Sequence, residues 1–177
     1  YRIRPVTHAV FANRILRDAG LLVVRDSPEG ELIDMEKSRA WALCDHQVAH
    51  VYLKLGLARD ERDRLVQQIH ALFDTRRGVK QVYSGTALVG AALSDTPVPS
   101  LASRCGDLVI ESTPEAWFAY PWWTDAAKAP SFARTIDIHR KPGYDPLEMF
   151  IDRTAPPPPG MPFGIPLDTN LVKGSHG

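Results

Sequence analysis

The sequence predicts a mixed α/β fold, in which short strands alternate with helices. Two observations support this class: apolar runs bounded by turn residues recur along the chain, and one long segment has helical apolar spacing. The chain has 177 residues, 44% of them hydrophobic and 24% charged, which is enough for one ordinary domain with a core. The 21 basic and 21 acidic residues balance, so charge gives no reason to expect nucleic acid or an anionic membrane as a partner.

The first part of the chain predicts an extended run, a helix and a hairpin. Residues 2–6 predict the extended run, and Thr7 predicts the N-cap of a helix that ends at Gly20. Residues 21–25 predict a strand, and residues 31–35 predict its hairpin partner after a Ser-Pro-Glu-Gly turn. The apolar face of the predicted helix consists of Phe11, Ile15, Leu16 and Ala19.

The middle of the chain predicts three strands and the clearest helix. Residues 38–44 and 50–55 read as strands, and residues 60–76 have the periodicity of an amphipathic helix. Gly78 is expected to end this helix, and residues 79–83 predict the next strand. The buried stripe of the helix is expected to contain Leu65, Val66, Ile69, Leu72 and Phe73.

The last part of the chain predicts one more strand, over residues 107–111, followed by an aromatic segment over residues 117–123. The aromatic rings could stack a base or a sugar, but such residues more often pack a small core or cover a cleft. Asp145 begins a predicted helix with a capping box, and the proline-rich residues 155–162 predict a stiff connector. Residues 38–104 could form a small inserted subdomain.

Residues 45–50 (DHQVAH) place one carboxylate and two imidazoles at the end of an apolar strand. Divalent metals such as zinc favour this mixture of oxygen and nitrogen donors. Residues an even number apart share one face of a strand, so His46 and His50 could face one cavity. The alternative is a polar turn in which Asp45 bonds to its own backbone. Composition alone favours neither.

Two further clusters contain histidine. Asp137 and His139 alternate along a predicted strand, and His139 with the following Arg140 and Lys141 could bind a phosphate. The alternative there is a solvated loop. In the segment Gly174-Ser175-His176-Gly177, flanking glycines permit close backbone approach, which suits a ligand that projects into a site. The alternatives are a flexible tail or a cloning scar, and the native-looking sequence before it argues against a scar.

The order of these segments resembles the later half of the type I phosphodiesterase/nucleotide pyrophosphatase branch of the alkaline phosphatase superfamily. Residues 106–110 resemble its Pro-Asp-Leu-Val strand, and residues 173–177 resemble its Gly-Thr-His-Gly motif, whose histidine ligates a metal. Residues 45–50 and 139–145 look like signatures of a bacterial subgroup of alkaline phosphatase family proteins. The resemblance implies an alkaline-phosphatase-like mixed sheet with flanking helices, of which residues 1–177 form an incomplete, C-terminal portion.

For function, the resemblance implies a metal-dependent hydrolase of phosphoric esters with two divalent ions, zinc being the expected metal. The substrate would be a small phosphate ester or a nucleotide, with neither nucleic acid nor membrane as a partner. A Thr or Ser nucleophile is expected before residue 1, so the chain alone is expected to be inactive. The alternatives are a catalytically reduced relative with a binding role, or a phosphomutase or sulfatase on the same scaffold.

The expected site residues fall into two groups. His176 is expected to ligate a metal by its motif match, whereas Asp45 and His46 are expected as further metal ligands on composition and strand-end placement. Residues that could support these ligands or bind substrate are His50, Asp137, His139, Arg140 and Lys141. No window approaches the roughly 18 consecutive apolar residues of a membrane span. The compartment stays open, with the cytoplasm favoured.

Overall fold

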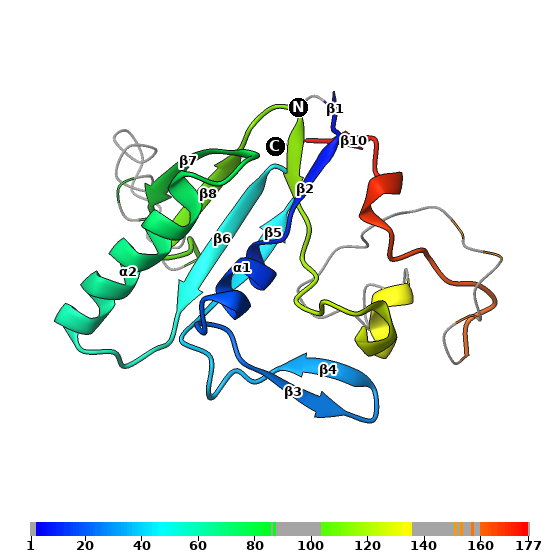
Figure 1. The fold of residues 1–177 in the computed structure, drawn as a ribbon, viewed down its shortest axis with the longest axis horizontal. Coiled ribbons are helices and arrows are strands. Elements are labelled where there is room, and N and C mark those ends of the chain that lie inside the picture. The colour runs from blue at the N-terminus through cyan, green and yellow to red at the C-terminus, as the bar shows by residue number, and fades with distance from the viewer. Residues whose placement is uncertain are drawn as a thin grey trace.

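The structure is a computed structural model that describes residues 3–85, 87, 104–135, 151, 153, 157 and 160–176. Its main feature is a four-stranded antiparallel sheet in the order β5–β6–β8–β7 (Figure 1). The strands of this sheet are β5 (Ala40–Asp45), β6 (Val48–Leu53), β7 (Val79–Ser84) and β8 (Leu108–Ser112). The sheet therefore includes a strand from beyond the predicted subdomain at residues 38–104, whose boundaries stay a prediction.

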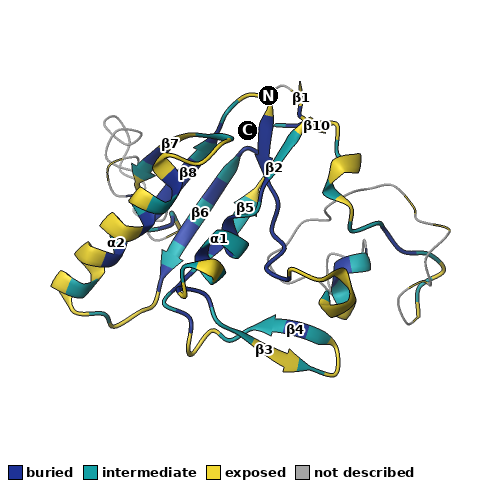
Figure 2. Ribbon diagram, viewed as in Figure 1, coloured by how far each residue is buried: buried dark blue, intermediate teal, exposed yellow. Residues whose placement is uncertain are grey.

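In the part of the chain that the structure describes, two helices pack on this sheet. Helix α2 (Arg59–Asp74) lies against β7 and β8, and the shorter α1 (Ala12–Asp18) lies against β5. The register pairs Ala42 with Val51 and Val51 with Leu108, so these buried residues share one face. The opposite side of α2 is exposed (Figure 2). The hydrophobic core therefore lies between the helices and one face of the sheet.

Smaller elements surround the sheet. Strands β3 (Val24–Ser27) and β4 (Gly30–Ile33) form an antiparallel hairpin. Among the described residues, 3₁₀ helices cover Ala126–Lys128, Ser131–Arg134 and Thr169–Leu171. No helix in the described part of the chain has the length and apolar character needed to cross a membrane.

Two further strand pairs join segments that are far apart in the sequence. Strand β2 (His8–Val10) runs parallel to β9 (Ala116–Phe118). Strand β1 (Arg4–Pro5) pairs with β10 (Gly174–Ser175), which places the two ends of the chain side by side (Figure 1).

The structure confirms the mixed α/β class and the long helix, and it forms the predicted hairpin at Val24–Ser27 and Gly30–Ile33, but the predicted cap of the first helix is wrong. Helix α1 begins at Ala12, after Phe11, and no side chain caps it. Thr7 instead donates its backbone N–H to the carbonyl of Glu115 at 2.9 Å. Pairing with β9 draws residues 8–10 into a strand, so a long-range contact overrides the local capping signal.

The aromatic segment forms core. Trp117, Phe118, Tyr120, Trp122 and Trp123 are each at most 6% exposed, so their rings offer no open face for stacking a base or a sugar. The indole N–H of one of them, Trp122, donates to a backbone carbonyl at 2.9 Å, which offsets the cost of burying this polar group. The helix predicted from Asp145 lies outside the described residues.

Candidate functional site

The turn between β5 and β6 presents His46. Asp45 pairs with Val48 across the hairpin, so His46 and Gln47 form a two-residue loop. His46 has a φ of 54°, a left-handed conformation that histidine adopts more readily than most residues. Because His46 lies in the turn and not in a strand, the alternation expected to place it on one face with His50 does not apply.

His176, which is also a predicted metal ligand, lies against this turn. Its ring centroid is 3.9 Å from that of His46, and the ring planes meet at 39°. The backbone N–H of Gln47 donates to the carbonyl of His176 at 3.0 Å. The fold therefore brings together two of the predicted site residues from distant parts of the chain. We call this arrangement of His46 and His176 the histidine pair.

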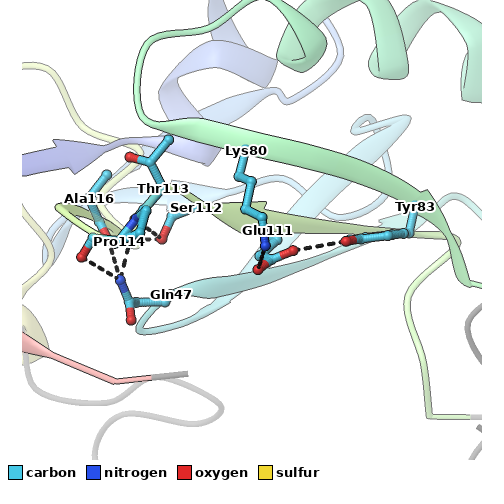
Figure 3. A network of polar contacts seen from close by, with 8 residues as sticks. All are labelled: Gln47, Lys80, Tyr83, Glu111, Ser112, Thr113, Pro114 and Ala116. Carbon is cyan, nitrogen blue, oxygen red and sulfur yellow. Dashed lines mark hydrogen bonds and ion pairs between the residues drawn. The ribbon is translucent and has the colours of Figure 1, made fainter. Parts of the chain in front are cut away.

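Gln47 is the residue of this region that the sequence analysis missed. Its side chain is buried, and Nε2 donates to the carbonyls of Thr113, Pro114 and Ala116 at 3.3, 3.1 and 3.0 Å (Figure 3). The backbone carbonyl of Gln47 accepts from the backbone N–H of Ser112 at 2.9 Å. These bonds tie the histidine turn to the β8–β9 connection. The sequence signal for this role was the position of Gln47, whose long, uncharged amide side chain lies between His46 and the apolar strand that begins at Val48.

A cavity of about 280 Å³ is lined in part by residues that adjoin the histidine pair in the chain or in a strand ladder. Its position follows from the chain: Gln47, which lines it, comes directly after His46, and Arg4, which also lines it, pairs with Ser175 in the β1–β10 ladder. Neither histidine is among its lining residues. The full lining consists of Arg4, Gln47, Val48, Lys80, Glu111, Ser112 and Pro114.

An ion pair dominates one wall of this cavity. Glu111 bonds to Lys80 Nζ at 2.6 Å and accepts from the Tyr83 hydroxyl at 2.8 Å (Figure 3). Burial opposes ionisation of Glu111, but the bonds from Lys80 and Tyr83 outweigh it, so its pKa lies below the usual value. With Arg4 and Lys80 against one carboxylate, the charge of the lining is positive overall.

Asp45 and His50 occupy the sheet face away from the helices. Asp45 pairs with Val48, which is two residues before His50 on β6, so both side chains lie on that face. His50 Nδ1 accepts from the N–H of Gly106 at 3.2 Å, and burial lowers the pKa of its imidazole. The nearby Asp45 carboxylate opposes this shift without reversing it.

The imidazole nitrogens of the histidine pair are a donor type that suits zinc, but two imidazoles are too few for a complete site. Within the residues that the structure describes, no three His, Cys, Asp or Glu side chains gather closely enough to hold a metal ion. Asp45 therefore does not join the pair in a three-donor set. Cys44 is no substitute, because burial raises the pKa of its thiol to about 12. Asp137, His139, Arg140 and Lys141 lie outside the described residues.

Residues 3–145 match the family model of type I phosphodiesterase/nucleotide pyrophosphatase. The chain belongs to this family. The match confirms the resemblance inferred from the sequence, and it ends before the segment that contains His176. No curated protein matches the chain.

Two similar solved structures are of one enzyme, phosphonoacetate hydrolase from Sinorhizobium meliloti 1021. The complex with phosphonoformate is 16% identical with a TM-score of 0.39, covering 67% of this chain and 26% of the enzyme. The complex with phosphonoacetate is 15% identical with a TM-score of 0.40, covering 72% and 28%. The family member described here thus spans about a quarter of the length of these neighbours.

Proposed function

We propose that the full-length protein is a metal-dependent hydrolase of phosphoric esters, of phosphodiesterase or nucleotide pyrophosphatase type. The observation that carries the proposal is the position of His176 in a chain of this family. This histidine, which resembles a family ligand motif, lies against a second imidazole, and neighbours of the pair contribute to a cavity with a positive lining. The chain spans about a quarter of its solved neighbours, so we place the nucleophile and the remaining ligands in parts it does not span.

In this proposal His176 holds one of two divalent ions, and zinc is the metal that its donor type favours. Such ions polarise phosphoryl oxygens and lower the pKa of the attacking group. The residues of this chain hold the ligand and attract the substrate. The β1–β10 ladder and the Gln47 N–H restrain the backbone around His176. Arg4 and Lys80 provide positive potential for a small anionic phosphate ester or nucleotide.

The test uses full-length protein and measures bound zinc and turnover of bis-p-nitrophenyl phosphate. We expect a chelator to abolish turnover, and His176→Ala to lose both turnover and bound metal. His70→Ala, on the half-buried side of α2, serves as the matched control and should retain both. Phosphonoacetate and p-nitrophenyl sulfate complete the substrate panel. Turnover of the sulfate alone would favour a sulfatase, and a full-length protein without metal or turnover would favour a catalytically reduced relative.

A further inference from the structure

The separation of the two rings in the histidine pair bears on what His46 does. Two imidazoles that ligate one zinc ion tetrahedrally at about 2.0–2.1 Å would hold their ring centroids about 5 Å apart. The centroids of His46 and His176 are 3.9 Å apart, with only 39° between the ring planes. The rings are therefore in tilted contact, closer together than two ligands spread around a common ion.

We propose that His46 is a positioning residue for His176, and not a metal ligand itself. This inference rests on the proposed function, in which His176 holds a metal. The ring of His46 limits the rotation of the His176 side chain, and the N–H of the next residue, Gln47, holds the His176 carbonyl. Together they orient an imidazole before a metal binds, as partners around metal ligands commonly do.

The segment that contains His176 needs such support. Strand β10 has two residues, and its ladder with β1 consists of two residue pairs. One further bond, from the N–H of Val6 to the carbonyl of Lys173 at 3.1 Å, restrains the approach to this strand. The glycine at position 174 adds backbone freedom. Orienting the ring in advance therefore removes an entropy cost that metal binding would otherwise include.

The turn that supports it is well anchored. The carbonyl of His46 accepts from the N–H of Phe118 at 2.6 Å, where strand β9 ends. The side chain of Gln47 bonds to three carbonyls of the β8–β9 connection and β9. The His46 ring thus projects from a rigid hairpin end, which is the arrangement that a positioning residue requires.

The test compares variants of full-length protein, with zinc affinity from chelator competition and the visible spectrum of the cobalt-substituted protein as readouts. His46→Phe keeps a flat ring without a ligating nitrogen. His46→Asn tolerates the positive φ but has no ring. We expect His46→Phe to bind zinc within about threefold of wild type with an unchanged cobalt spectrum, and His46→Asn to bind about tenfold more weakly at unchanged stoichiometry.

Circular dichroism of the metal-free variants checks that each is folded, and His70→Asn is the control for the chemical change alone. Loss of one zinc equivalent with an altered cobalt spectrum in His46→Phe would identify His46 as a ligand and overturn the inference. Wild-type affinity in His46→Asn would overturn it as well. Wild-type protein without metal, or His176→Ala with full metal content, would instead refute the proposed function, and with it the premise of this inference.

Discussion

Replacing Gln47 by Leu tests whether this amide holds the histidine turn in place. The substitution keeps a side chain of similar size but removes the donor of three bonds, to Thr113, Pro114 and Ala116. Two of these carbonyls keep a second donor, because the Ser112 hydroxyl bonds to those of Thr113 and Ala116 at 3.0 and 2.8 Å. The Pro114 carbonyl accepts from Gln47 alone among the bonds of the described residues.

The expected cost follows from this inventory. A buried acceptor left without a donor costs about 1–3 kcal/mol, so we expect Gln47→Leu to destabilise the protein by about 2 kcal/mol. For a cooperative unit of about 150–250 residues this is a fall of about 4–8 °C in melting temperature. Thermal unfolding of full-length protein measures it. Gln67→Leu, on the exposed side of α2, is the matched control and should shift the melting temperature by under about 2 °C.

The result bears on the site as well as on stability. If Gln47→Leu melts within the range of the Gln67→Leu control, the three bonds do not restrain the turn and the reasoning is refuted. If the expected loss occurs, zinc affinity should also fall, because the same residue anchors the His176 carbonyl through its backbone. A large loss of stability with unchanged zinc affinity would separate the turn from the ligand.

Two further predictions concern backbone packing and pH. Gly78→Ala should lower the free energy of unfolding by about 2–4 kcal/mol, because the added Cβ would lie 2.8 Å from Val10 Cγ2 at a φ of 86°. The control Gly56→Ala, with a φ of 78° and no atom within 4 Å of the added Cβ, should lower it by about 1 kcal/mol. Equal shifts in melting temperature for the two variants would contradict this prediction. Burial opposes ionisation of Glu31, but the bond from Arg17 at 2.6 Å outweighs it, so its pKa lies below 4.5. As pH falls, the unfolded chain therefore binds a proton at Glu31 before the folded protein does, and the stability that the carboxylate contributes is lost below pH 4.5. The melting temperature of Glu31→Gln should therefore depend less on pH between about pH 6 and pH 3 than that of the wild type. An equally steep acid decline in that variant would exclude this role.

Much of the fold follows from the sequence by itself, because the signals are local. The apolar residues of α2 repeat every three to four residues, which is a helical period. The turn before Glu31 joins two short strands that are close in the sequence and pair with each other. Both elements formed, although Val66 and Leu72 are only partly buried in the helix and the first hairpin strand begins at Val24. The Thr7 cap did not, because the neighbouring residues pair with β9, which lies more than a hundred residues later in the sequence.

The candidate site divides in the same way. Composition and strand-end placement indicated His46, and the resemblance of residues 173–177 to a family motif indicated His176. Only the tertiary structure decided that these two rings touch and that Asp45 and His50 lie on the sheet face away from the helices. It also decided that the side chain of Gln47 anchors the turn by hydrogen bonds to the β8–β9 connection. The physical reason is that a side chain's chemistry is encoded at its own position, whereas its neighbours are set by chain segments that meet only when the sheet and the β1–β10 ladder form.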